Sequence, residues 1–472
     1  MASYENFYPG SDYGLDPNYG LVGTEGYGNF TGYRVGVSDI GFPSDPTTAN
    51  QLAKVSEKLR TGAKTIEVSG VNIMGGGAMK LIDSIPKQQF EEIRRLKELT
   101  GADLSFHGPL VEPTGISRQG WEDTQRQQAE REIFSTIERA HELAPKGNIP
   151  VVFHSSNIGI EPEARVIDEK TGKEVVTQIA AIDERTGQIV SAIGPATKDY
   201  LQRDPKADIK EELKNENQER WFRSLQSTNF NAYTGLADAQ RALSSEEEGR
   251  VSGEEGKKTI LDFYKNYVGN PQEADKNLKI IEKEHPHEAE AIKSKMLHLT
   301  HADIYLRDAY QNFKNLFNQA YDYAERTDSK KDKEILDGYR DRMVPIIKDL
   351  EKDPSKILDF GRGLNEGINV LRQISVPQTL RPMKEFMIDK ASDTFANAAF
   401  SSYKKFKDSS PLIVIENPPA GAPLSRADEL RDLVKQSREK FTKKAQEEFG
   451  LSEEAARRQA EKLIGVTWDV GN

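Results

Sequence analysis

The chain has 472 residues, of which 36% are hydrophobic and 30% charged, with a formal net charge of -11 and no cysteine. The lack of cysteine excludes disulfides and thiolate ligands, so any metal site must use imidazole and carboxylate groups. No apolar run of about 18 residues and no signal peptide are visible, so we expect no membrane span and a cytoplasmic location. The negative charge weakens a nucleic-acid-binding function without excluding it, because a local groove can be basic on an acidic protein.

Residues 1–33 form a Tyr/Gly-rich segment without helical or strand periodicity, which we interpret as an N-terminal tail or surface strap. From residue 34 to residue 157 the pattern alternates strands and helices. The predicted strands cover residues 35–40, 64–69, 103–107 and 149–154, and the predicted helices cover residues 50–60, 86–100 and 121–143. The strands are rich in apolar residues, which is typical of parallel strands buried on both faces.

The alternation stops between about residues 158 and 410. Residues 167–175 and 182–190 are a short repeat with Thr-Gly between β-forming residues, which predicts a hairpin meander over 158–200. Residues 201–410 appear helical, and the longest predicted helix, 288–326, has apolar residues at steps of three and four. We therefore expect a helical insertion over 201–410 whose helices pack mainly on one another, with Phe313 in its core.

The strand–helix pattern returns in residues 411–472. The sequence predicts a fifth strand over 411–416, helices over 426–449 and 452–463, and a sixth strand over 465–469. Ser452, followed by two glutamates, is expected to cap the last helix.

Four of the predicted strands end on a side chain that can bind a metal, namely His107, His154, Glu416 and Asp469. The carboxyl ends of parallel strands meet at one edge of a sheet, so these four groups are expected to converge. Two imidazoles and two carboxylates form a mixed nitrogen and oxygen set suited to Zn²⁺, Mn²⁺ or Fe²⁺.

Other candidate sites have less support. The Gly-rich segment 74–79 could approach a phosphate, but it lacks the Lys-Ser/Thr of a P-loop and is more simply a loop. His298 and His301 are three residues apart on the long predicted helix, without a further ligand set nearby, and are more simply a solvated helix flank. Glu67 lies within the second strand and could face the interior of a barrel.

The strand-end motifs resemble those of a known superfamily. The third strand ends His-Gly-Pro from His107, the fourth ends at His154, the fifth ends Glu-Asn from Glu416, and the sixth ends Asp-Val-Gly-Asn from Asp469. Their order and placement resemble the xylose isomerase-like TIM barrels, most closely the endonuclease IV-type (AP endonuclease family 2) barrels. The resemblance covers about residues 34–157 and 411–472, less than half of the chain, and each motif is short.

This resemblance implies an α/β fold, a (β/α) TIM-type barrel. The barrel would be incomplete, with about six of its eight strands and truncation after strand six, and the hairpin-plus-helical insertion would lie between strands four and five. It also implies a divalent-metal-dependent enzyme that hydrolyses a phosphodiester at abasic DNA sites or a related phosphoester. His107 and His154 would be terminal ligands, Asp469 a further ligand, and Glu416 the catalytic residue that bridges metals. Zinc is the expected ion, with manganese or magnesium as alternatives.

The chain also departs from that pattern. Asn472 stands where the family has a histidine ligand, and the last two strands with their ligands are absent. A second polypeptide segment is one way to complete the barrel. A sugar isomerase or epimerase of the same superfamily is an alternative, in which Glu416 and Asp469 would hold one metal and the substrate would be a sugar rather than DNA. A third alternative is a degenerate barrel that serves as a non-catalytic scaffold.

Overall fold

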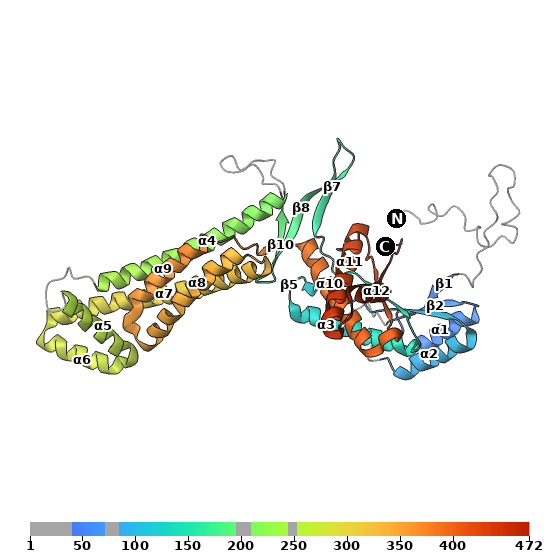
Figure 1. The fold of residues 1–472 in the computed structure, drawn as a ribbon, viewed down its shortest axis with the longest axis horizontal. Helices are drawn as coiled ribbons and strands as arrows, with labels where there is room; N and C mark the ends of the chain where they lie inside the picture. Colours follow the sequence, from blue (N-terminus) through green and yellow to red (C-terminus); the bar gives the residue numbers. More distant parts are fainter. Residues whose placement is uncertain (1–39, 71–84, 195–208, 244–252, 472) are drawn as a thin grey trace. The chain divides into compact units, whose positions relative to one another are not determined.

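The computed structural model describes residues 40–70, 85–194, 209–243 and 253–471 (Figure 1). The chain divides into two compact units. Of the described residues, the sheet unit comprises 40–70, 85–182, 186–191 and 382–471, and the helical unit comprises 183–185, 192–194, 209–243 and 253–381. The Tyr/Gly-rich segment 1–33, the Gly-rich segment 74–79, Asn472 and nearly all of the strand expected at 35–40 lie outside the described residues.

The sheet unit is built on six parallel strands whose spatial order follows the chain, β1-β2-β3-β6-β11-β12. Their bounds are β1 Gly41–Pro43, β2 Thr65–Ser69, β3 Asp103–His107, β6 Pro150–His154, β11 Leu412–Glu416 and β12 Ile464–Thr467. The helices that connect them are α1 Gln51–Arg60, α2 Lys87–Thr100, α3 Asp123–Leu143, α10 Met383–Phe406, α11 Ala427–Phe449 and α12 Glu453–Leu463. Successive helices contact one another in chain order. The mixed α/β class and the parallel sheet expected from the sequence are confirmed.

Local sequence sets where several of these helices begin and end. The Asn50 side chain caps α1 by accepting a hydrogen bond from the Ala53 N–H at 3.1 Å. Gly101 ends α2 in the left-handed conformation, with φ of 66°. The predicted cap of α12 is confirmed, because the Ser452 hydroxyl accepts from the Ala455 N–H.

Burial alternates along β3 and β11, whereas Val151, Val152 and Phe153 of β6 are all buried, so the expectation that both faces are buried is met only in part. In β3, Leu104 and Phe106 are buried, whereas Ser105 and His107 are partly exposed. The buried set, which includes Ile66, Phe106 and Ile413, forms one hydrophobic core with the helices. The helices therefore bury one face of the sheet, and the other, polar face carries Glu67, Ser105 and His107 beside Val152 and Val414.

The helical insertion is shorter than expected at its C-terminal end. Helix α10 was expected to belong to the insertion, which was placed over residues 201–410. Instead it packs on α3 and α11, and its buried residues, among them Phe395, join the core of the sheet unit. The physical reason is that α10 lies shortly before β11 in the chain and buries 13 of its 24 residues, so it covers the sheet as the other connecting helices do.

The hairpin meander expected over 158–200 is present. Strand β7 (Glu163–Ile167) pairs antiparallel with β8 (Glu174–Asp183), and β9 (Ile189–Ile193) also pairs with β8. A separate two-stranded hairpin, β4 (Ile116–Ser117) and β5 (Gly120–Trp121), precedes α3.

The helical unit has its own hydrophobic core. Its elements are α4 Ile209–Ala242, α5 Gly253–Gly269, α6 Pro271–Glu284, α7 Pro286–Arg326, α8 Lys330–Lys352, α9 Ile357–Leu371 and the short strand β10 Leu380–Pro382. Helices α4, α7, α8 and α9 run side by side (Figure 1). The apolar seam of α7 is buried as predicted, with Phe313 3% exposed. Gly367 lets α9 pack closely against both α7 and α8. A Cβ at this position would lie 2.5 Å from Phe313 of α7 and 2.4 Å from the Tyr339 hydroxyl of α8.

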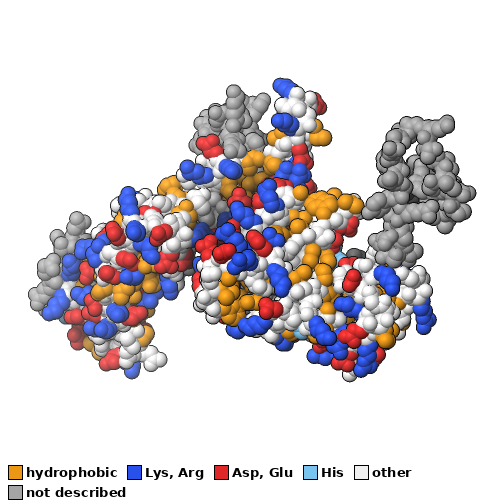
Figure 2. Space-filling model, turned by 45° about the vertical axis from the view of Figure 1, so that its right-hand side comes forward, with side chains coloured by type: hydrophobic (Ala, Val, Ile, Leu, Met, Phe, Trp, Pro, Cys, Tyr) orange, Lys and Arg blue, Asp and Glu red, His pale blue; other side chains and the backbone are white. Residues whose placement is uncertain are grey.

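The surface carries both signs of charge. Basic and acidic side chains are interspersed over the face seen in Figure 2, without an extended basic area there. Within the described part of the chain, no helix combines the length and the apolar character that a membrane crossing requires.

Candidate metal centre

Three of the four predicted ligands are brought together at the carboxyl ends of adjacent strands. His107 ends β3, His154 ends β6 and Glu416 ends β11. The register aligns His154 with Glu416, while His107 is aligned with Val152, two residues before His154. Because alternate residues point to the same face of a sheet, all three side chains lie on the polar face. Here the prediction from strand ends is confirmed for these three residues.

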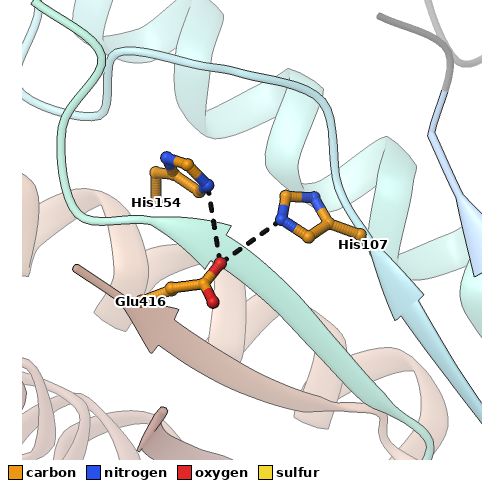
Figure 3. Close-up of side chains that lie close together, drawn as sticks. All are labelled: His107, His154 and Glu416. Carbon is orange, nitrogen blue, oxygen red and sulfur yellow. Dashed lines mark ion pairs between the residues drawn. The ribbon is translucent and has the colours of Figure 1, made fainter. Parts of the chain in front are cut away.

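The Glu416 carboxylate lies between the two imidazole rings (Figure 3). Its Oε2 atom is 3.3 Å from Nε2 of His107 and 3.4 Å from Nε2 of His154. The rings are 5.4 Å apart between centroids, in an edge-on arrangement. Exposed fractions of 23% for His107, 15% for His154 and 13% for Glu416 show a site that is largely shielded but still open to solvent.

These separations fit a divalent cation. Metal–ligand bonds of about 2.0–2.2 Å in a tetrahedral site place neighbouring ligand atoms roughly 3.4 Å apart. The two nitrogen–oxygen distances match that edge length, and the three ligand atoms lie within 4.8 Å of one another. Among the described residues, no other group of three His, Asp or Glu side chains brings its ligand atoms this close together.

The backbone fixes the proton on His107. Its Nδ1 atom lies 2.9 Å from the Gly108 carbonyl oxygen, which can only accept, so Nδ1 carries a hydrogen. In the neutral ring, Nε2 therefore directs its lone pair toward Glu416, as a metal ligand would. Burial would lower the pKa of His107, but the Glu416 hydrogen bond, the Gly108 contact and the charges of Glu67 and Glu416 outweigh it and raise the pKa.

The two histidines differ electrostatically. Burial and the neighbouring charge of His107 lower the pKa of His154, against the opposing effect of Glu416 and Asp469. Burial raises the pKa of Glu67, a half-buried carboxyl group on β2 whose charge interacts with His107 and Glu416. Glu67 pairs with Ser105, two residues before His107, so its side chain lies on the same face of the sheet as the three converging residues.

Asp469 has a different setting from the other three predicted ligands. Strand β12 ends at Thr467, two residues earlier than expected. The backbone groups of Asp469 bind the side chain of Asn417 instead of a neighbouring strand. The Asn417 amide donates to the Asp469 carbonyl at 2.9 Å, and its Oδ1 accepts from the Asp469 N–H at 2.8 Å. The Asp469 Oδ1 accepts from the Gly471 N–H at 2.7 Å, and this carboxylate is outside the three-ligand group. Its role as a ligand stays a prediction.

A partly buried carboxylate that the sequence analysis does not single out joins the two loops that follow the histidines. Glu112 lies in the loop after β3, and one of its oxygens accepts from the backbone N–H and the hydroxyl of Thr114. The other oxygen accepts from the Ser156 hydroxyl at 2.8 Å and the Asn157 N–H at 2.7 Å, in the loop after β6. Burial raises the pKa of Glu112, and these hydrogen bonds oppose that shift. In the sequence, Glu112 is the one charged residue in the otherwise apolar segment 109–113, and this is the feature that could have indicated its role.

Gly108 is required by packing beside the site. A Cβ at this position would lie 2.3 Å from the Phe153 ring, a distance that no side chain can occupy. The Gly108 N–H also donates to the Val152 carbonyl at 2.8 Å. The glycine therefore allows the chain after His107 to lie against the strand that carries His154.

The second histidine pair has an ordinary setting. His298 Nδ1 lies 3.5 Å from the Asp238 carboxylate, and His301 is exposed on α7. This agrees with the simpler interpretation of a helix flank.

Comparisons of the chain with protein-family models, curated proteins and solved structures find no match. The functional argument therefore depends on the geometry of the site and on the short strand-end motifs.

Proposed function

We propose that the sheet unit binds a divalent cation through His107, His154 and Glu416 and uses it to hydrolyse a phosphoester, with abasic-site DNA as the leading substrate. The observation that carries this proposal is the position of one carboxylate oxygen at tetrahedral-edge distance from two imidazole nitrogens. Two histidines and a glutamate are a ligand set used by catalytic zinc sites, which makes zinc the expected ion ahead of manganese or magnesium.

The residues of the chain would divide the work. His107 and His154 would hold the cation, and Glu416 would supply a negative ligand that can be shared between metals. The hydrogen bond from His107 Nδ1 to the Gly108 carbonyl would orient that ring. A bound cation would supply charge neutralisation at a phosphoryl group and activation of water.

We also propose that the six-stranded sheet is part of a (β/α) barrel of the xylose isomerase-like class. In support, neighbouring strands are all parallel, and the helices that lie between successive strands contact one another in chain order. The polar face that holds the three ligands would then be the barrel interior. In such barrels the chemistry lies at the carboxyl ends of the strands, where these ligands are.

The pair of histidines favours the endonuclease-like chemistry over the sugar isomerase alternative. The isomerase version would depend on Glu416 and Asp469 as ligands of one metal, and Asp469 lies outside the three-ligand group. The scaffold alternative has no requirement for a metal.

Metal content and turnover distinguish these functions. The full chain, purified without chelator, is analysed for bound metals and assayed on duplex DNA with one abasic-site analogue, on intact duplex and on a ketose sugar. We expect bound zinc and cleavage of the abasic duplex that stops with EDTA and returns with zinc. Glu416→Gln, which keeps the shape of the side chain, should reduce cleavage by about 100-fold or more, in line with loss of a metal-site carboxylate.

Glu454→Gln is the matched control, since Glu454 is exposed on α12. Sugar turnover with one manganese or magnesium per chain would replace the hydrolase proposal with the isomerase. A chain that binds no divalent metal would contradict both enzymes and leave the scaffold.

A further inference from the structure

A long groove lies on the sheet unit away from the metal centre. It runs between α11, α12 and β12 and has a volume of about 930 Å³. Its α11 wall extends from Ala427 to Gln446, which is roughly 29 Å at 1.5 Å per residue. That length accommodates about five turns of an α-helix.

The end of the groove beside β12 exposes large apolar side chains. Leu430 and Val434 of α11 lie in its floor, and Val466 and Trp468 lie along its β12 side. Val466 is 54% exposed, Trp468 is 50% exposed, and the adjacent Val470 is 90% exposed. β12 is also the last strand of the sheet order, with β11 as its partner. Exposed apolar residues along a groove are typical of a binding surface.

The rim of the groove is basic on an otherwise acidic protein. Five basic residues line it, against three acidic ones. The basic residues are Arg431, Lys435, Arg438, Lys443 and Arg457, and the acidic residues are Glu439, Glu453 and Glu461. The groove therefore has a formal charge of +5 − 3 = +2, whereas the chain has -11.

Two of these lysines are available to a partner. Lys435 is 72% exposed and lies 4.0 Å from Glu439, at the limit of an ion pair. Lys443 has no ion pair with any described residue. Both are on α11, two turns apart, so they can contact acidic groups along one flank of a docked helix.

We propose that this groove is the docking site for an acidic amphipathic α-helix of a partner protein. The apolar stripe of that helix would cover Val466 and Trp468, and its acidic flank would lie against Lys435 and Lys443. Helix-in-groove recognition of this kind uses apolar residues at helical spacing for affinity and charges at the rim for selectivity. None of the three candidate metal ligands lines this groove.

Two synthetic helical peptides test the proposal. They share one leucine stripe and differ only in having glutamate or lysine on the flanks. Of the three tryptophans, Trp468 reports binding because it is half exposed and lines the groove, whereas Trp121 and Trp221 lie outside the groove lining. We expect the glutamate peptide to shift tryptophan emission of the full chain to shorter wavelength, to bind about tenfold more tightly than the lysine peptide, and to weaken with added salt.

Variants locate the binding and separate the alternatives. Lys435→Glu should weaken binding of the glutamate peptide several-fold and strengthen binding of the lysine peptide. Lys348→Glu, on the exposed face of α8, should leave both affinities unchanged. Trp468→Ser should remove the emission shift. Equal affinity for both peptides, or no binding, would overturn the proposal. Concentration-dependent dimerisation that Trp468→Ser abolishes would also overturn it, because the occupant would be a second copy of the chain.

Discussion

Glu112 accepts a hydrogen bond from Ser156 at 2.8 Å and thereby joins the loop after β3 to the loop after β6. Those loops follow His107 and His154, so one partly buried carboxylate connects the segments that carry two candidate metal ligands. Each of its oxygens also accepts from a backbone N–H, that of Thr114 or that of Asn157. An amide side chain cannot replace it, because its NH₂ group would face one of these donors.

Glu112→Gln is therefore expected to lower both stability and metal affinity. The backbone N–H of buried Thr114 or of exposed Asn157 loses its acceptor, and at Thr114 this costs about 1–3 kcal/mol of unfolding free energy. Urea denaturation and competition with a zinc chelator measure the two effects, with Glu122→Gln at the start of α3 as the control. Unchanged zinc affinity with reduced stability would show that the Glu112 hydrogen bonds between the two loops do not position the metal ligands.

The charge of His107 makes the metal-free protein sensitive to pH. Its pKa is raised in the folded state, so the protonated ring stabilises the fold fully below the usual value of 6.5. This contribution is lost as pH rises through the higher folded-state pKa. We expect the difference in unfolding free energy between the natural chain and His107→Asn to shrink as pH increases above 6.5. Denaturation in EDTA at several pH values measures it. His301→Asn, at an exposed position on α7, is the control variant, and a difference that grows with pH would contradict the direction assigned to His107.

Asn417 is expected to hold the segment that follows β12. Asn417→Ala removes two hydrogen bonds to the Asp469 backbone, at about 1 kcal/mol each. Hydrogen exchange at the Asp469 amide should become faster. Asn417→Asp keeps an acceptor for that amide and loses the donor, so its exchange should be slower than in Asn417→Ala. Equal exchange in the two variants would show that the side chain does not hold this segment.

Phe313 should be essential for the helical unit. Phe313→Asp places an unpaired charge in a core position that is 3% exposed, at a cost of several kcal/mol. We expect loss of protection from hydrogen exchange along α7. Phe230→Asp is the matched control, since Phe230 is 66% exposed on α4 in the same unit. Retained protection in Phe313→Asp would contradict the assigned core.

The sequence by itself determined the order of strands and helices, the long seam of α7 and the placement of His107, His154 and Glu416 at strand ends. These follow from local periodicity and from the alternation of side chains along a strand. The meander and the Ser452 cap were likewise predictable from turn and capping residues.

Only the tertiary structure decided which helices belong to which unit and which strand face is buried. Helix α10 has the same local pattern as the insertion helices, and its place under the sheet depends on the partners that it meets. Likewise, the hydrogen bond between Glu112 and Ser156 joins residues 44 positions apart, and the bonds between Asn417 and Asp469 join residues 52 positions apart. Periodicity describes neighbours along one element, whereas these contacts arise when separate elements pack together.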